Sequence, residues 1–515
     1  MLLDKYSKLR HVKCDEALPH CQRCIKAKRP CHYTDPSVKP DDPVKFVVYA
    51  AQKEPTPFPG LTRSERRSLH HFQHRSAEEI PSPFRSELWS RIILQVAERS
   101  PAVRHGIFAL SSMHEYFSSP DTSQALLSDF SMHHYNKSIR NAIRITAPDE
   151  SFDALLLTSV MFCALEGLKG DFEQSLQHAL SGLRIIARGR QGCHPSSAAI
   201  PDDMLPSIFL ALQTQVMELE DLSIFRVYPD VAQKFPPLPD HFSDVEEAMR
   251  YLQILLNQMI GFSDRFHTAC QHMVYVPAEV PEPLLPEFTA IRDWFYLWDE
   301  AVSRIDTIIT GSDGKQHKAL LLLKIYQSVM RTVIDSLDKQ IPSVDSFEPE
   351  IMGILKLAEV FLQSQSGWQS SSFGEAVTQP IRPSAPSPVF SISLGVVPVL
   401  FEIAHRARNP QLREEALRLL RSCNRREGVW DSQVAARIAE RHNALQDEVD
   451  ARFAEDSTDY RVFITDIGLL TEGNIPFVQC PQKYMIVPAG AHLMDNYWLG
   501  GFNPPSDQER FESIA

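Results

Sequence analysis

Four of the nine cysteines in this chain lie close together near the N-terminus, with the spacing Cys-x6-Cys-x2-Cys-x6-Cys. They are Cys14, Cys21, Cys24 and Cys31. Two thiolates separated by two residues can reach one zinc ion from a tight turn, and a flanking cysteine can return to the same ion after a short helix. The spacing therefore predicts a zinc site that holds together a segment with almost no apolar core. Disulfides are the alternative, which the basic flanks and the intracellular location predicted below disfavour.

Charge is distributed unevenly along the chain. The first 40 residues contain nine Lys and Arg residues against four Asp and Glu residues, a net charge of +5. The whole chain of 515 residues has a net charge of −13, so the remainder carries −18. A basic segment on an acidic body indicates a polyanionic partner at one end of the molecule. The cysteines weigh against the alternative, a solvated basic tail.

The residues around the cysteines resemble a known family. The segment from Lys8 to Tyr33 has a lysine before its first cysteine, Cys-Asp-Glu at that cysteine, a proline in the loop and Cys-His-Tyr at its end. In these features it is similar to the DNA-binding domain of the fungal Zn2Cys6 (C6 zinc cluster) transcription factors. The resemblance implies Zn2+ as the cofactor and double-stranded DNA with CGG-type half-sites as the partner.

The chain departs from the family pattern at two positions. The family has six cysteines, and Asp4 and Ser7 stand where the first two would be. The family domain binds two zinc ions that share cysteines. With two cysteines missing, one zinc would keep Cys21, Cys24 and Cys31, and the other would keep only Cys14 and Cys21, whereas a structural zinc takes four ligands. A single zinc is therefore expected, with a further ligand from Asp4 or from one of three histidines: His11, His20 and His32. A mis-assigned first exon, replacing a true Cys-x2-Cys, is a simpler hypothesis.

The resemblance also implies roles for basic residues. In the family, a short helix ahead of the third cysteine enters the major groove, so Lys13 would contact guanine acceptors. Lys8, Arg10 and His11 would support it, mostly at phosphates. Further phosphate contacts, or a nuclear import signal, would come from Lys26, Lys28 and Arg29.

The rest of the chain is predicted to be mainly α-helical. The expected domains are an incomplete Zn2Cys6 module at 1–35, a proline-rich linker at 36–60, a helical regulatory domain at 61–450 and a C-terminal tail at 451–515. Short strands are expected at 460–465 and 484–487, and a Ser/Pro-rich loop at 366–392. No heptad run follows the cysteines, so any homodimer is expected to form through the body rather than through a coiled coil.

Apolar residues recur at helical spacing in several segments of the body. The clearest helices are expected at 86–98, from 101 onward, and at 155–168, 172–187, 411–423 and 433–449. Pro101 suits the first position of a helix, and Gly170 separates two of the segments. Ser64 is predicted to be a plain N-cap of the first helix, because Arg67 rather than an acid follows three residues later.

A second resemblance lies in three segments of the body, at 64–110, 162–184 and 395–431. Together they look like the fungal-specific regulatory domain found downstream of Zn2Cys6 clusters, and the similarity is weaker between 200 and 375. This resemblance implies a helical regulatory and interaction region without catalytic residues. The chain is accordingly not predicted to be an enzyme, and it contains no His-Glu-x-x-His, Gly-x-Ser-x-Gly, Gly-x-Gly-x-x-Gly or Walker sequence.

Several other residues are expected to be structural. The adjacent pairs His70-His71 and His133-His134 point to different helix faces, so neither pair is predicted to bind a metal. Glu166 lies in an apolar segment and is expected to be paired at a helix interface. Core positions are expected for four tryptophans, namely Trp89, Trp294, Trp298 and Trp430. Buried thiols are expected at the scattered cysteines, which are Cys163, Cys193, Cys270, Cys423 and Cys480.

Composition excludes several classes of protein. Hydrophobic residues make up 43% and charged residues 23% of the chain, as in globular proteins, and the cysteines are too sparse for a secreted disulfide scaffold. No run of about 18 uncharged apolar residues is present, and the first residues lack the apolar stretch of a signal peptide. An intracellular protein without a membrane span is therefore expected.

These patterns together predict a nuclear transcription regulator that binds specific DNA sequences through its N-terminal zinc module and contacts the transcription machinery. Control of a secondary-metabolite gene cluster is a common role in the family. The alternative is a helical interaction protein whose degenerate zinc cluster no longer binds DNA. Zinc content and binding to CGG-bearing DNA would distinguish the two.

Overall fold

Helices dominate the computed structural model of the chain, as the sequence predicts. The chain divides into two units, residues 1–59 and 60–515. In the first unit the described residues form one short helix, α2 (Gln22–Lys26). The structure describes residues 15, 17, 19–29, 58, 60–84, 86–118, 124–145, 148–191, 208–212, 214, 235–270, 280–305, 314–339, 344–364, 388–428, 430–452, 454, 460–464, 470–472, 475–477 and 484–488.

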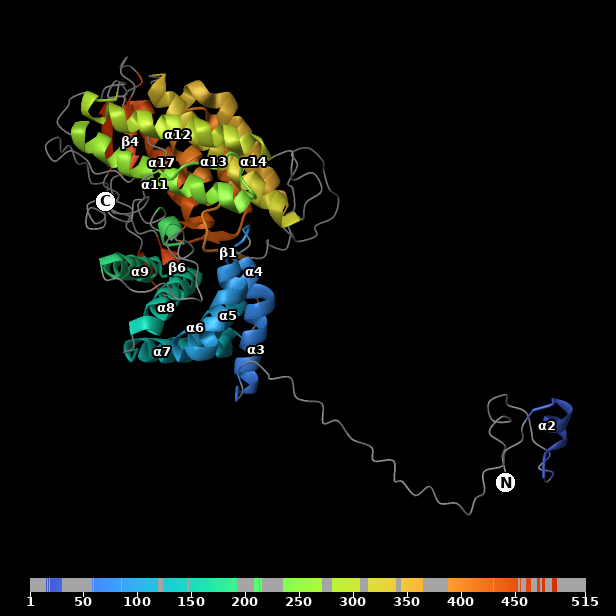
Figure 1. Cartoon of the computed structure of the whole chain (residues 1–515). Helices are drawn as coiled ribbons and strands as arrows, with labels where there is room; N and C mark the ends of the chain where they lie inside the picture. The colour runs from blue at the N-terminus through green and yellow to red at the C-terminus, as the bar shows by residue number, and fades with distance from the viewer. Residues whose placement is uncertain are drawn as a thin grey trace, which may run out of the picture. The chain divides into compact units, whose positions relative to one another are not determined.

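The second unit begins with a group of helices built around one central helix. Its elements are α3 (Arg63–His71), η1 (Phe72–Ser76), α4 (Ala77–Glu79), η2 (Leu88–Ile92), α5 (Ile93–Arg99), α6 (Pro101–Ser118), α7 (Gln124–Ile143), α8 (Pro148–Lys169) and α9 (Phe172–Gln191). The central helix α6 packs against α3, α5, α7 and α8 (Figure 1). The predicted helices from residue 101 and on both sides of Gly170 are confirmed, whereas the predicted helix at 86–98 begins with the π-helical turn η2.

Gly170 ends α8 because the chain there needs a left-handed backbone. Its φ is +82°, and the next amide, Asp171 N, donates to the Glu166 carbonyl at 3.0 Å. A Cβ at this position would also lie 3.3 Å from the Arg426 guanidinium. Glycine tolerates both conditions, which is why α8 and α9 can turn so tightly against each other.

The predicted N-cap of the first helix is wrong. α3 begins at Arg63, so its N-cap is Thr62 and not Ser64. The Thr62 hydroxyl accepts the Glu65 amide proton at 3.2 Å, and the Glu65 carboxylate accepts the Thr62 amide proton at 2.8 Å. This reciprocal pair is a capping box, and it satisfies two amide groups that an N-terminus otherwise leaves unpaired.

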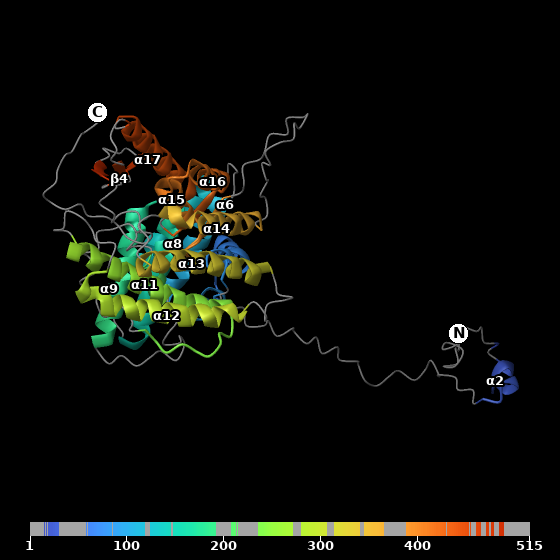
Figure 2. The same ribbon diagram turned by 90° about the horizontal axis from the view of Figure 1, so that it is seen from above.

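The second group of helices follows in the sequence. Its elements are α11 (Val245–Cys270), η5 (Glu282–Leu284), α12 (Leu285–Ser303), α13 (Gly314–Asp338), η7 (Val344–Phe347), α14 (Glu348–Gln363), α15 (Val397–Arg406), α16 (Pro410–Ser422) and α17 (Ser432–Arg452). α11 packs against α12 and α13, and α14 packs against both α13 and α16 (Figure 2). The helices predicted near 411–423 and 433–449 are confirmed as α16 and α17. No described helix combines the length and apolar character that a membrane span requires.

Seven short strands complete the described elements. They are β1 (Val389–Ser391), β2 (Arg425–Glu427), β3 (Trp430–Asp431), β4 (Tyr460–Ile464), β5 (Leu470–Glu472), β6 (Ile475–Phe477) and β7 (Tyr484–Pro488). β1 pairs in parallel with β2, which pairs antiparallel with β3. The two strands predicted in the tail are confirmed, because β4 pairs antiparallel with β7. The prediction of a loop over 366–392 is wrong at its end, where β1 forms, and residues 366–387 lie outside the described residues.

β1 and the residues after it connect the two groups of helices. Ile392 N donates to the Ile80 carbonyl at 2.8 Å, and Ser391 Oγ donates to the Ser82 carbonyl at 2.7 Å. On the other side, β1 pairs with β2, which leads towards α17. Segments about 310 residues apart in the sequence are therefore held by a backbone–backbone hydrogen bond and by a bond from a serine hydroxyl to a backbone carbonyl.

Most residues predicted to be structural are buried as expected. Glu166 is 2% exposed, and its carboxylate accepts a hydrogen bond from Lys169 Nζ at 2.5 Å. Three of the tryptophans are buried and Trp430 is partly exposed against Phe401. The thiols Cys163 and Cys423 are buried, and the side chains of the other three scattered cysteines lie outside the described residues.

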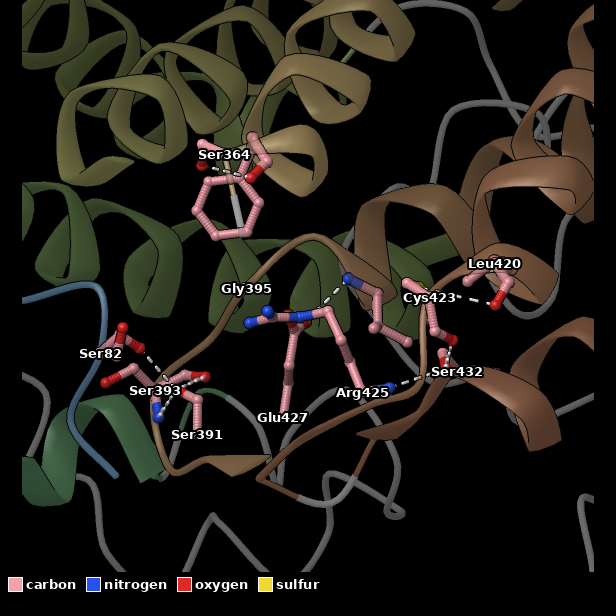
Figure 3. A network of polar contacts seen from close by, with 12 residues as sticks. Ser82, Ser364, Ser391, Ser393, Gly395, Leu420, Cys423, Arg425, Glu427 and Ser432 are labelled. Carbon is pink, nitrogen blue, oxygen red and sulfur yellow. Dashed lines mark hydrogen bonds and ion pairs between the residues drawn. The ribbon is translucent and has the colours of Figure 1, made fainter. Parts of the chain in front are cut away.

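A buried ion pair lies where β2 meets the start of α15 (Figure 3). Arg425 Nε and Glu427 Oε1 are 2.7 Å apart, and their side chains are 4% and 0% exposed. The second carboxylate oxygen accepts the amide proton of Val397, the first residue of α15, at 2.8 Å. The Arg425 guanidinium also lies 5.4 Å from the centre of the Phe361 ring on α14. The pair therefore ties β2 to two helices, and both charges are compensated.

Histidines and serines form a second buried polar cluster between α3, η1 and α6. His114 is 2% exposed, and its Nδ1 lies 3.1 Å from Ser76 Oγ, which also contacts His71. Burial lowers the pKa of His114 to about 3, with smaller contributions from His71 and Arg75. Glu79 is 3.5 Å from His114 Nε2, but its side chain is 40% exposed, so water screens its attraction and burial decides the direction.

This depressed pKa predicts acid sensitivity. His114 takes up a proton near pH 6.5 in the unfolded chain but only near pH 3 in the folded chain. The free energy of unfolding therefore keeps its full value above pH 6.5 and decreases as the pH falls from 6.5 towards 3. One proton corresponds to about 1.4 kcal/mol per pH unit, or roughly 2–3 kcal/mol between pH 6.5 and pH 4.5. We expect the His114→Gln variant to show a shallower pH dependence of the unfolding free energy, by about one proton. The exposed His133→Gln is the control, and equal slopes for His114→Gln and the unaltered chain would contradict the prediction.

Candidate metal centre and nucleic-acid interface

The cysteine-rich segment is described around α2, where two of the four predicted ligands lie. Cys21 is the N-cap of α2 and Cys24 lies in its first turn, so the two-residue spacing places both on one side of the helix start. The Cys24 amide donates a hydrogen bond to Cys21 Sγ at 3.3 Å. A sulfur that accepts an amide proton is stabilised as a thiolate, the form that binds metals.

The ends of α2 are fixed by local hydrogen bonds. The carboxylate of Asp15 accepts the Gln22 amide proton at 3.0 Å, which satisfies a donor of the first turn. At the other end, Lys28 adopts a left-handed backbone with φ of 49°, and Arg29 N donates to the Cys24 carbonyl at 3.1 Å. This turn reverses the chain directly after the helix.

The two sulfur atoms, rather than aliphatic side chains, occupy the interior of this segment. Cys21 and Cys24 are 2% and 5% exposed and are the buried residues among those described between positions 15 and 29. Ile25, an apolar residue that could have formed a small core, is 53% exposed. Two buried sulfurs in a helix of five residues without an apolar core fit a zinc ion, which supplies the binding energy that burial of apolar surface cannot.

The outer surface of α2 and its turn is basic. Its exposed cations are Arg23, Lys26, Lys28 and Arg29. Asp15 is the one acidic side chain described near them, and its carboxylate already caps α2. A cluster of exposed cations attracts nucleic-acid phosphates by releasing condensed counterions, without selecting a base sequence.

The remaining predicted site residues lie outside the described residues. They are the ligands Cys14 and Cys31 and the DNA-contacting residues Lys8, Arg10, His11 and Lys13. Of the predicted nitrogen ligands, His20 is described and exposed, directly before Cys21. The sequence analysis missed the capping role of Asp15, for which the signal was an acid ahead of the Cys-x2-Cys turn.

Two family models match the chain. The fungal Zn(2)-Cys(6) binuclear cluster domain matches residues 8–40, so the match begins after Asp4 and Ser7. The fungal specific transcription factor domain matches residues 67–198, which contain most of the helical group from α3 to α9. Domains of the first kind bind zinc, in agreement with the two buried sulfurs of α2.

Characterised proteins similar to this chain are fungal regulators. The aspercryptin biosynthesis cluster-specific transcription regulator atnN of Emericella nidulans is 26% identical over 526 aligned positions, which cover 84% of this chain and 85% of that protein. The Zn(2)-C6 fungal-type transcription factor afumD of Aspergillus fumigatus is 26% identical over 169 positions, which cover 30% of this chain and 45% of that protein. The transcription regulator lscL of Purpureocillium lilacinum is 24% identical over 202 positions, or 35% of this chain and 47% of that protein.

No solved structure matches the chain. The two family models lie in the order that the sequence predicts, the cluster domain first and the helical domain after it. All three of these relatives are named as transcription regulators or transcription factors. On these grounds the chain is a DNA-binding transcription regulator that is similar to the fungal zinc-cluster regulators.

Proposed function

We propose that this regulator recognises CGG-type half-sites through a single zinc ion bound by Cys14, Cys21, Cys24 and Cys31. The observation that carries the proposal is the burial of Cys21 and Cys24 at the start of α2, with the Cys21 sulfur already accepting an amide proton. Cys14 would take the fourth position in place of the Asp4 or histidine ligand expected from the family pattern, and four thiolates complete the tetrahedral shell of a structural zinc. Asp4 and Ser7 stand at the positions of the ligands that a second zinc would need, and neither is a thiol.

Base recognition is proposed for Lys13, which directly precedes Cys14. Lysine can donate to the O6 and N7 acceptors of guanine in the major groove. Lys8, Arg10 and His11 would contact the flanking phosphates, and the exposed cations of α2 would add further backbone contacts. Phosphate contacts supply affinity, whereas the lysine at the groove supplies the preference for CGG.

The rest of the chain is proposed to regulate this activity in the nucleus. We assign 1–35 to the zinc module, 36–60 to a linker, 61–450 to the regulatory domain and 451–515 to a tail. Contacts with a second copy of the chain and with the transcription machinery would form on the helical body. Similarity to the aspercryptin cluster regulator over 84% of the chain supports a biosynthetic gene cluster as the target.

The second candidate is a helical interaction protein that does not bind DNA. Asp4 and Ser7 favour it, because an incomplete zinc shell would leave the DNA-contacting residues without a fixed register. The two candidates differ in one measurement on the full chain, the ratio of affinities for a CGG duplex and for a scrambled duplex at one salt concentration. A ratio near one, together with no zinc that has sulfur neighbours, would favour the interaction protein.

Substitution of Lys13 tests the proposed base contact. We expect Lys13→Ala to lower the preference for CGG over scrambled DNA by a factor equivalent to about 1–3 kcal/mol, since a lost base contact is felt only on the specific sequence. Lys26→Ala is the matched control, because a lost phosphate contact should weaken both complexes equally and reduce the salt dependence. Fluorescence anisotropy with both duplexes measures the effect. An equal loss on both duplexes for Lys13→Ala would assign this lysine to the backbone instead.

A further inference from the structure

Three potential metal ligands from three helices lie close together in the second unit, residues 60–515, which is called the regulatory unit below. Glu65 lies in the first turn of α3, His105 in α6 and His134 in α7. One ligand atom of each lies within 4.8 Å of the others, and the two imidazole Nδ1 atoms are 2.9 Å apart. Each of the three lies on a different helix, so this group exists because α3 and α7 both pack on α6.

We propose that Glu65, His105 and His134 form a second zinc site, which ties the first helix of the regulatory unit to α6 and α7. Two imidazole nitrogens and one carboxylate oxygen are a common protein ligand set for Zn2+, with the fourth position taken by water. The proposal is independent of the cysteine site and of the DNA-binding function.

The spacing of the ligand atoms suits a zinc ion after a small adjustment. Tetrahedral zinc with Zn–N distances of about 2.0–2.1 Å separates two nitrogens by roughly 3.3 Å. The observed Nδ1 separation of 2.9 Å would therefore have to widen by a few tenths of an ångström. Side-chain rotation supplies a shift of this size, since His105 and Glu65 are both only partly buried.

Each ligand has an atom available for the metal. The hydrogen bonds that the structure shows to the Glu65 carboxylate reach Oε2, from the Thr62 amide and hydroxyl, which leaves Oε1 for a metal ion. The two Nδ1 atoms are within hydrogen-bond distance, so one neutral imidazole carries its proton on Nδ1 and the other on Nε2. For zinc to bind both Nδ1 atoms, the Nδ1 proton would move to Nε2 of the same ring, and both Nδ1 lone pairs would then face the ion.

The surroundings keep the histidines in the form that binds metal. Burial lowers the pKa of His134 to about 4, with a further contribution from His105, and burial also lowers the pKa of His105. Both imidazoles are thus neutral at pH 7, and metal binding does not have to displace a proton from an imidazolium. The His134 ring is held in place between Phe130 and Phe108, at centroid distances of 4.3 and 5.2 Å. Two neutral imidazoles of fixed orientation therefore lie beside a carboxylate, which is a ligand set that Zn2+ binds.

The second histidine cluster of the same helices makes a useful contrast. His71 and His114 have serine hydroxyls as their hydrogen-bond partners at 3.1 to 3.3 Å. Serine hydroxyls satisfy an imidazole without a metal, and among the described residues these two histidines do not appear in a three-ligand group. The zinc site is therefore assigned to His105 and His134 with Glu65, and not to His71 and His114.

The test uses the full chain with Cys14, Cys21, Cys24 and Cys31 replaced by serine, so that zinc held by the cysteine segment does not contribute. The protein is stripped with a chelator, dialysed against Zn2+ and then freed of unbound metal. We expect about one zinc per chain by elemental analysis, with X-ray absorption showing only nitrogen and oxygen neighbours at about 2.0–2.1 Å. Zinc should also raise the thermal midpoint of this protein, because a ligand of the folded state stabilises it.

Substitutions then assign the ligands. In the same background, His105→Ala and His134→Ala should each reduce the retained zinc at least tenfold and abolish the thermal shift. Glu65→Gln should weaken zinc binding while its amide oxygen preserves the capping box with Thr62, which separates the ligand role from the helix cap. The exposed His133→Ala on α7 is the matched control and should retain zinc.

Two outcomes would overturn the proposal. One is a chain with the four N-terminal cysteines replaced that retains no zinc above a stripped blank although circular dichroism shows it to be folded. The other is retained zinc that is unchanged by His105→Ala, a substitution at a half-buried position that leaves the α6 core intact. Failure here would leave the cysteine site untouched, since that site is measured separately by sulfur neighbours at about 2.3 Å in the unaltered chain.

Discussion

Replacement of Cys24 by serine is expected to remove the zinc bound by the cysteine segment and, with it, the preference for CGG-bearing DNA. Cys24 is one of two buried sulfurs, and among the residues described from 15 to 29 no aliphatic or aromatic side chain is buried beside them. The loss of one thiolate is therefore expected to leave α2 without the interaction that holds it. Specific binding typically exceeds non-specific binding by 10³-fold or more, and the variant should fall to the non-specific level. Elemental analysis of zinc and anisotropy titrations at fixed salt measure the two losses.

The exposed cations of α2 remain in this variant and should still attract DNA, with a steep dependence on salt. The control is Cys163→Ala, which removes a buried thiol of the regulatory unit and should leave zinc content and DNA affinity unchanged. If Cys24→Ser kept both its zinc and its CGG preference, the assignment of Cys24 as a ligand would be wrong. If the unaltered chain showed neither, the interaction-protein candidate would stand.

The second large effect is expected at the buried ion pair of β2. Glu427→Ala should destabilise the regulatory unit by about 3–5 kcal/mol, since it leaves the Arg425 charge buried without its partner. The substitution also removes the acceptor of the Val397 amide proton at the start of α15. Urea unfolding followed by tryptophan fluorescence measures the loss.

Two further variants separate the charge from the contacts around it. In Arg425→Met/Glu427→Leu both charges are absent, and we expect it to be more stable than Glu427→Ala because no uncompensated charge is buried. Glu414→Ala breaks an ion pair with Arg421 in which the two side chains are 67% and 45% exposed, and it should cost less than about 1 kcal/mol. A loss for Glu427→Ala no larger than for Glu414→Ala would show that the buried pair contributes little.

Much of this molecule follows from local sequence signals. The Cys-x2-Cys spacing places Cys21 and Cys24 together at the start of a helix, Pro101 begins α6, and Gly170 ends α8. Each signal acts within a few residues, through the geometry of a turn or a missing amide proton. The capping box at Thr62 is readable in the same way, from Thr-x-x-Glu, but the N-cap was predicted at Ser64, two residues later.

The tertiary structure decided which faces meet. A helical period shows that a face is buried, but it does not name the helix that covers it. For this reason the proximity of Glu65, His105 and His134 could not be predicted from the sequence, although each residue is visible in it. Two other contacts depend on the same packing, namely the pairing of β1 with β2 and the hydrogen bond from the Val397 amide to Glu427. In each case the two segments lie about 30 or more residues apart, so they meet only when the helices pack together. Short-range geometry fixed the metal-binding turn and the helices, and long-range packing created the buried charges.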